Sequence, residues 1–181
     1  MQIMSGHNKW TQIKHQKGAA DVKKSKVFSM LGRQIAIEAK QANGDRSLPG
    51  LRQVIEKAKA ANMPNDNIDR AIKNAVGGTG ESMEEVTYEA YGPGGSAIII
   101  TGITDNKNRT SQEIKHLLVE HGGNLAGPGA ALWAFTKNNE GEWRAGTSLA
   151  LPEAERSALI NLIGVIEAHD DIKRVYTNAT L

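Results

Sequence analysis

The sequence predicts an α+β protein in which a basic N-terminal helical bundle is followed by a ferredoxin-like β-α-β-β-α-β domain with an added hairpin strand. Apolar residues recur at helical spacing up to residue 75 and alternate as in strands from residue 86 onward. The charge also changes sign. Residues 1–75 contain 14 Lys and Arg against 6 Asp and Glu, or +8, whereas residues 76–181 contain 8 against 14, or −6. We therefore expect a basic domain over residues 1–78 and an acidic domain over residues 79–181.

Three helices are expected in the first domain. The first covers residues 19–41, and the lysines of the leader before it could follow a phosphate backbone if that leader is extended up to Gly18. Pro49 suits the first turn of a second helix over residues 49–62, because its fixed φ is helical and its missing N–H would be unpaired there. The third helix covers residues 65–75, where an Asn or Asp side chain can cap the first free N–H groups.

The second domain is expected to open with a β-hairpin. Residues 86–91 and the β-branched run at residues 97–104 are typical of strands, and the glycine-rich segment between them is typical of a turn. A helix is then predicted from the capping box formed by Thr110 and Glu113, because the hydroxyl and the carboxylate can each satisfy a free N–H group.

The remaining elements complete the ferredoxin-like order. Residues 131–135 and 143–151 are expected to form two strands joined by a short polar turn. Pro152 starts the last helix, and residues 172–177 close the domain with a strand.

The composition narrows the class of protein. There is no cysteine, so disulfides and thiolate metal sites are excluded. No apolar run approaches the roughly 20 residues of a membrane span, and no apolar signal core follows the basic N-terminus. We expect a cytoplasmic protein without a membrane partner.

Motifs for catalysis and for cofactors are also missing. The sequence has no GxxxxGK[ST] loop, no GxGxxG turn, no HExxH pair and no GxSxG elbow. His116 and His121 are five residues apart, which does not place two ligands on one helical face. The acids Asp170 and Asp171 follow a helix end, where turn formation explains them. We therefore predict no enzyme activity, no cofactor, no metal and no small-molecule substrate.

The segment SGHNKWTQIKHQKGAADVKKSK, residues 5–26, holds six lysines against one acid. Lysines in such a segment can neutralise phosphates, and an aromatic ring among them can stack on an unpaired base. The candidate nucleic-acid-binding residues are Lys9, Trp10, Lys14, His15, Lys17, Lys23, Lys24 and Lys26. Two alternatives stay open: Trp10 as a packing anchor, and the lysines as an ordinary solvated surface.

A second polar segment lies where a buried strand meets a capped helix. Its candidate contact residues are Asp105, Asn106, Asn108 and Arg109. The planar guanidinium of Arg109 can bond two oxygens of a phosphate or carboxylate. The alternative is an ordinary turn.

The kind of nucleic acid is less sharply indicated. The third helix offers only Asn67, Arg70 and Lys73 toward base edges, which is little for a recognition helix. RNA binding through the sheet is disfavoured, because residues 129–135 do not match the basic and aromatic RNA-binding signature. The lysine-rich segment suits ribosomal RNA or nonspecific duplex DNA.

Several long motifs resemble those of the YebC/PmpR-type family. They are SGHNKWTQIKHQK, IEKAKAANMPNDNIDRAIKNAVG, YEAYGPGG, TDNKNRT, GGNL, GPG with LWAF, and HDDIKRVYTN, in the order of the family and over nearly the whole chain. Family members are labelled transcriptional regulators in bacteria and are related to a mitochondrial translational activator of cytochrome oxidase.

The resemblance implies a helical N-terminal domain, an α+β remainder, no catalysis and a role in gene expression, either as a DNA-binding regulator or as a ribosome-associated factor. Relatives usually carry a third small domain, which is expected to be absent here near residues 136–142. The leading hypothesis is a non-enzymatic RNA-directed or ribosome-associated translation factor. The alternatives are a DNA-binding transcriptional regulator and a protein-interaction adaptor that does not contact nucleic acid.

Overall fold

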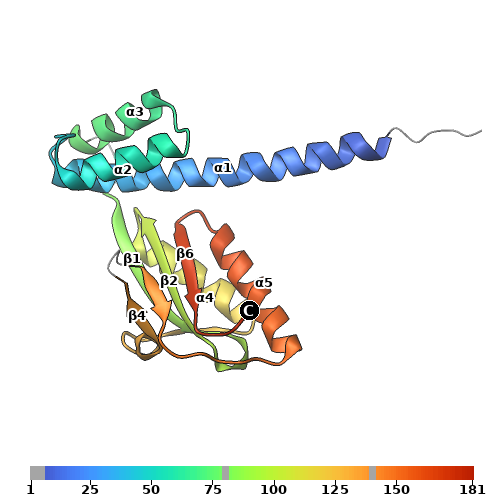
Figure 1. The fold of residues 1–181 in the computed structure, drawn as a ribbon. Coiled ribbons are helices and arrows are strands. Elements are labelled where there is room, and N and C mark those ends of the chain that lie inside the picture. Colours follow the sequence, from blue (N-terminus) through green and yellow to red (C-terminus); the bar gives the residue numbers. More distant parts are fainter. Residues whose placement is uncertain (1–6, 79–81, 139–141) are drawn as a thin grey trace, which may run out of the picture. The chain divides into compact units, whose positions relative to one another are not determined.

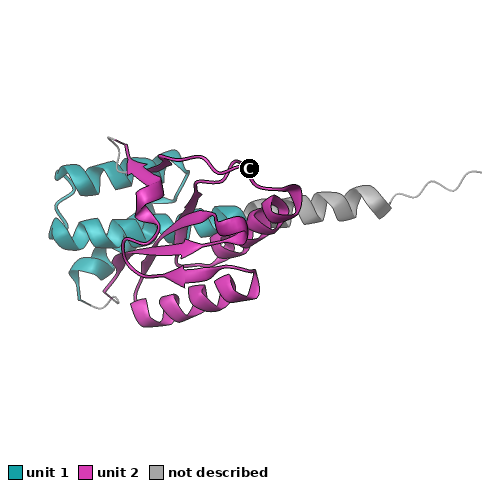
Figure 2. Ribbon diagram, turned by 90° about the horizontal axis from the view of Figure 1, so that it is seen from below, with its two compact units in different colours: residues 1–79 teal, residues 80–181 magenta. Residues whose placement is uncertain are grey.

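The computed structural model describes residues 7–78, 82–138 and 142–181, with side chains from Lys23 onward. The chain forms two compact units, residues 1–79 and residues 80–181 (Figure 2). Residues 76–79 carry no charge, so the formal charges of the two units are the +8 and −6 of the two sequence halves.

Unit 1 consists of three helices: α1 (His7–Gln41), α2 (Pro49–Ala60) and α3 (Asn65–Val76). The predicted start of the first helix at residue 19 is wrong, because α1 already begins at His7 and the leader up to Gly18 is helical there. The residues before Gly18 contain no proline, and a single internal glycine costs a helix only about 1 kcal/mol. No helix in the described ranges combines the length and the apolarity that a membrane crossing requires.

The core of unit 1 lies between the C-terminal part of α1 and the other two helices (Figure 1). Its buried residues come from the three helices and the two loops between them, and are Ile35, Ala39, Ala42, Leu51, Val54, Ile55, Ala58, Met63, Ile68 and Ile72. Pro49 occupies the first turn of α2, as predicted. Among the described side chains of α1, Phe28 is the first along the chain that packs against this core.

Unit 2 is built on one antiparallel sheet in the order β3-β1-β2-β6. Its elements are β1 (Glu84–Tyr91), a 3-10 turn η1 (Pro93–Gly95), β2 (Ala97–Thr104), α4 (Lys107–Glu120), β3 (Asn124–Ala126), a 3-10 turn η2 (Leu132–Ala134), β4 (Phe135–Lys137), β5 (Trp143–Ala145), α5 (Glu153–Ala168) and β6 (Ile172–Thr177). The predicted α+β class is confirmed.

The strand assignment inside this class differs from the prediction. The sheet is ferredoxin-like in having four strands and two helices, but its strand between β2 and β3 is β1, which the sequence indicated only as an addition. The segments at 131–135 and 143–151 instead give η2 and the separate two-stranded hairpin of β4 and β5. The reason is the tight β1–β2 hairpin, which pairs eight residues on each strand, whereas β4 and β5 pair only three.

Alternate residues of β2 pack into two different hydrophobic cores, one on each face of the sheet. Ile98 and Ile100 pack with residues of α4 and α5 on one face of the sheet. Ala97 and Ile99 pack on the other face against residues of η2 and β4, including Phe135. Unit 2 therefore has three layers, with helices on one side of the sheet and the small β4–β5 hairpin on part of the other (Figure 1).

Candidate nucleic-acid interface and polar cluster

The described basic residues of the leader lie on α1. Lys23 and Lys24 are exposed, and Lys26 is partly buried. The Lys24 ammonium lies 5.5 Å from the centroid of the Phe28 ring, at the N-terminal edge of the core. Among the side chains that the structure describes, no acid forms an ion pair with Lys23 or Lys24. Within the described part of unit 1, both ammonium groups are therefore exposed and not neutralised by an acid.

The other predicted contacts of the leader share the same helix. Lys9, Trp10, Lys14, His15 and Lys17 lie within the helical range of α1, but their side chains are outside the described residues. Their contact with nucleic acid stays a prediction.

The predicted polar contact site forms the start of α4. Its N-cap is Asn106, whose side-chain oxygen accepts a 3.1 Å hydrogen bond from the Arg109 backbone N–H. The predicted capping box of Thr110 and Glu113 is therefore not the cap, and the helix begins at Lys107. Asn108 is exposed, and its side chain makes none of the described contacts of this cluster.

A chain of hydrogen bonds runs from this cap into the interior. The Asn106 backbone N–H donates to the Thr104 hydroxyl at 2.9 Å, and the Thr104 and Thr110 hydroxyls lie 2.8 Å apart. The Thr110 hydroxyl in turn donates to the Asp171 carboxylate at 2.6 Å. Both threonines are fully buried and Asp171 is 2% exposed. Since each buried group has a partner, the chain stabilises the junction of β2, α4 and β6.

Arg109 neutralises the acids at this junction. Its Nη2 atom lies 2.6 Å from Asp105 and 3.0 Å from the Asp171 carboxylate. Hydrogen bonds to Asp105 and then to Asp171 raise the pKa of Arg109 further above its ordinary value. The fork expected to bind an external phosphate is thus already bonded to two carboxylates, although 43% of the side chain stays exposed.

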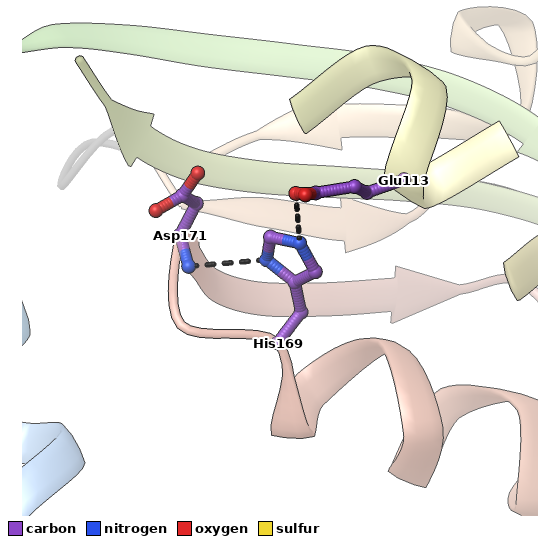
Figure 3. Close-up of side chains that lie close together, drawn as sticks. All are labelled: Glu113, His169 and Asp171. Carbon is purple, nitrogen blue, oxygen red and sulfur yellow. Dashed lines mark hydrogen bonds and ion pairs between the residues drawn. The ribbon is translucent and has the colours of Figure 1, made fainter. Parts of the chain in front are cut away.

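His169 completes the cluster beside α4 (Figure 3). Its Nε2 atom lies 2.9 Å from Glu113, and its Nδ1 atom accepts a 3.1 Å hydrogen bond from the Asp171 backbone N–H. The tautomer therefore carries its proton on Nε2, which donates to Glu113. The ligand atoms of Glu113, His169 and Asp171 lie within 4.8 Å of one another, as in a metal site. Both ring nitrogens are already bonded, however, so the hydrogen bonds explain the arrangement without an ion.

Glu89 is an organising residue that the sequence analysis missed. This residue is 7% exposed, and its carboxylate accepts backbone hydrogen bonds from Gly129 at 2.6 Å, Ala131 at 2.7 Å and Leu132 at 3.0 Å. Burial raises the pKa of Glu89, but the three N–H donors outweigh it and leave the pKa below its ordinary value. The sequence offered one signal for a buried acid: Glu89 stands between Tyr88 and Ala90 in the second half of a strand.

The loop held by Glu89 presents an aromatic side chain. The Tyr91 hydroxyl donates to the Ala130 carbonyl and accepts a 3.2 Å hydrogen bond from the Trp133 indole N–H. Trp133 is 63% exposed. The loop is thus fixed to the sheet by both Glu89 and Tyr91.

The fold and these sites define a two-unit α+β protein with a basic helical unit and an acidic unit built on an antiparallel sheet. Two family models match it. The model for the TACO1/YebC protein N-terminal domain matches residues 8–78, and the model for the TACO1/YebC second and third domain matches residues 83–140. The chain belongs to the TACO1/YebC family.

Similar proteins support this assignment. A "Probable transcriptional regulatory protein" from Petrotoga mobilis is 53% identical over 136 residues, which are 74% of this chain and 54% of that protein. A protein of the same name from Desulfitobacterium hafniense is 50% identical over 139 residues, 76% of this chain and 55% of its own. The chain thus spans about half the length of the curated relatives it matches. The crystal structure of a conserved hypothetical protein from Aquifex aeolicus has a TM-score of 0.78 at 28% identity and covers 86% of this chain and 90% of its own.

Proposed function

We propose that this protein is a non-enzymatic nucleic-acid-binding regulator of gene expression that acts in the cytoplasm on RNA, as a ribosome-associated translation factor. The observation that carries the proposal is the charge of unit 1, +8, together with the exposed Lys23 and Lys24 on α1. The names of the relatives, which describe regulatory proteins, support the coarser part of it.

The helical course of α1 gives the basic segment a defined shape. Residues 9–26 rise about 26 Å along the helix at about 1.5 Å per residue, so their lysines can meet several phosphates in a fixed arrangement. The proposed contacts are Lys9, Trp10, Lys14, His15, Lys17, Lys23, Lys24 and Lys26. Because such contacts release counterions and read little sequence, the affinity should depend steeply on salt.

We propose that the two units have different roles. Unit 1 binds the nucleic acid, and unit 2 either fixes the geometry of the bound complex or contacts a protein. Asp105, Asn106, Asn108 and Arg109 are a proposed polar contact of unit 2, of which Arg109 offers its exposed edge.

A DNA-binding transcriptional regulator is the second candidate, and the names of the relatives favour it. A helix that reads base edges would be needed. α3 offers Arg70 and Lys73 as exposed cations, whereas Asn67 is partly buried. This limited set favours contacts with the phosphate backbone over sequence reading, which argues against a sequence-specific DNA-binding regulator.

The test is the binding of the full chain to ribosomes, to structured RNA and to random duplex DNA over a series of salt concentrations. The logarithm of the association constant for single-stranded RNA should fall linearly with the logarithm of the salt concentration. Replacing Lys23 and Lys24 by Ala should make this fall less steep, by about 0.7 in the slope for each lysine. The control Lys115→Ala, an exposed lysine on α4, should leave the slope unchanged.

The outcomes separate the candidates. Tight, sequence-selective binding to a duplex at physiological salt would favour the transcriptional regulator. Co-sedimentation with ribosomes that survives changing Lys9, Lys14 and Lys17 to Glu would instead favour a protein-interaction adaptor.

A further inference from the structure

A cleft of about 460 Å³ opens on the sheet face of unit 2 that α4 and α5 leave uncovered. Strands β1, β2 and β6 form its floor, and the β4–β5 hairpin forms its wall. It is lined by Glu85, Val86, Thr87, Thr101, Gly102 and the six residues discussed below. Its size falls in the range of about 300–1,000 Å³ that is usual for ligand sites.

Two aromatic rings line the cleft, and each has a cation beside it. Trp143 on β5 and Tyr176 on β6 are both partly buried at the edge of the core that contains Phe135. The Lys137 ammonium lies 4.5 Å from the Trp143 ring centroid, and the Arg174 guanidinium carbon lies 5.9 Å from the Tyr176 ring centroid. Rings beside cations are the combination with which proteins bind single-stranded nucleic acids.

The cleft gathers positive charge within an acidic unit. Lys137, Lys173 and Arg174 are three of the 8 Lys and Arg of residues 76–181, whereas Glu85 and Glu142 are only two of its 14 acids. Glu142 already lies 3.2 Å from Arg174.

Two of the cations have no such acid among the residues that the structure describes. Lys137 and Lys173 are exposed, and neither forms an ion pair with any acid in the described part of the chain. The distribution of charge therefore favours an anionic ligand at this place.

We propose that this cleft is a second nucleic-acid site, which holds an unpaired segment with a base against Trp143 or Tyr176 and its phosphates at Lys137 and Lys173. The inference rests on the proposed function and gives unit 2 a direct part in it. The Lys137 ammonium lies over the Trp143 ring. Because the lysine side chain has a flexible stem of four carbons, the ammonium can move to a phosphate while a base stacks on the ring. A duplex is excluded as the ligand, because its bases are stacked and paired.

An acidic peptide is the competing ligand, and the two aromatic rings argue against it. Such a peptide would bind Lys137 and Lys173, but its carboxylates would not stack on the two aromatic faces. The inference differs from the prediction that RNA binding through the sheet is disfavoured. That prediction rested on residues 129–135, whereas the rings and cations of the cleft come from β4, β5 and β6. The folding of these distant segments onto one sheet face brings them together.

Single charge reversals test the site in the full chain. The probe is a ten-nucleotide uridine-rich RNA, together with a DNA of matching sequence. Lys137→Glu and Lys173→Glu should each weaken binding about fivefold or more, and Trp143→Leu should weaken it between about five- and a hundredfold. The control is Lys115→Glu, which makes the same charge change on α4, on the other face of the sheet. Because Lys115 lies outside the cleft, this variant should alter binding less than twofold.

Photo-cross-linking locates the contact independently of variants that might fold poorly. With 4-thiouridine in the RNA, trypsin should release cross-linked peptides 138–144, which contains Trp143, and 175–181, which contains Tyr176. Cross-links confined to unit 1, with Lys137→Glu and Lys173→Glu binding as well as Lys115→Glu, would overturn the inference and leave the proposed function intact.

Two other results are decisive. If the wild-type chain binds neither oligonucleotide nor ribosomes, the proposed function fails together with the inference. If a polyglutamate peptide displaces the RNA and binds more weakly to Lys173→Glu but equally well to Trp143→Leu, the cleft is a site for an acidic protein segment and the inference is wrong.

Discussion

The Thr110 hydroxyl donates a 2.6 Å hydrogen bond to the Asp171 carboxylate, and this contact joins the first turn of α4 to the loop before β6. The backbone of Asp171 takes part as well, because its carbonyl accepts a 2.8 Å hydrogen bond from the Ile103 N–H of β2. One residue thus connects three elements, and it does so from a position that is 2% exposed.

Replacing Asp171 by Asn should destabilise unit 2. The amide keeps the shape of the carboxylate but loses the charge that holds Arg109 and strengthens the bond from Thr110. We expect the free energy of unfolding in urea, followed by tryptophan fluorescence, to fall by about 1–3 kcal/mol. The exposed Glu85→Gln on β1 should change it by no more than about 0.5 kcal/mol, and an equal effect of both would contradict the role given to Asp171.

Gly102→Ala should be destabilising for a steric reason. A Cβ atom at Gly102 would lie 2.3 Å from the backbone oxygen of Asp171, which cannot move without breaking its bond to Ile103. We expect a loss of at least about 2 kcal/mol in the free energy of unfolding, as for other overpacked positions.

Gly164→Ala is the matched control for this change. Gly164 lies inside α5 and is exposed, and a Cβ atom added there would meet no other part of the protein within 4 Å. Alanine there should stabilise the protein by about 0.5–1 kcal/mol because it favours the helix. Opposite signs at the two glycines are the expected result, and a loss at both would show a general intolerance of unit 2.

Glu89→Gln should produce a loss of stability that depends on pH. The folded state lowers the pKa of Glu89 below its ordinary value of 4.5, so the stabilisation is complete above that value and is lost as the pH falls through the folded pKa. At pH 7 the variant should therefore be less stable in urea by about 1–3 kcal/mol. The difference from the wild type should shrink as the pH is lowered below 4.5.

Glu85→Gln provides the comparison, since Glu85 lies on the same strand but is exposed. It should change the free energy of unfolding at pH 7 by no more than about 0.5 kcal/mol. A loss in Glu89→Gln that stays constant from pH 7 to pH 3 would argue against the charge of this carboxylate as the cause.

Local signals predicted most of the elements. Strands at residues 97–104 and 172–177 occur where the sequence placed them, because β-branched runs between turn residues leave little choice. Pro49 and Pro152 likewise marked the starts of α2 and α5. Helices and hairpins depend on neighbours in sequence, which explains this success.

Partners far apart in sequence could not be predicted. Nothing near Thr110 indicates that its hydroxyl bonds Asp171, 61 residues away, in addition to the Asn106 carbonyl at the start of its own helix. The same holds for the pairing of β1 with β3, since only three residues at Asn124–Ala126 form that edge strand. Of the predicted nucleic-acid site, the charge was visible in the sequence, whereas the helical course of its first residues was not.

Zinc should not stabilise the protein, although Glu113, His169 and Asp171 have the spacing of ligands. An ion would have to displace the Asp171 N–H from Nδ1 of His169 or the Nε2 proton that is directed at Glu113, and Arg109 already neutralises the nearby carboxylates. Thermal unfolding with zinc chloride should therefore have the same midpoint as unfolding with a chelator. An ion bound at 100 times its dissociation constant would add about 2.7 kcal/mol, so a rise of several degrees that His169→Gln abolishes would reveal a metal site in place of the hydrogen-bond network.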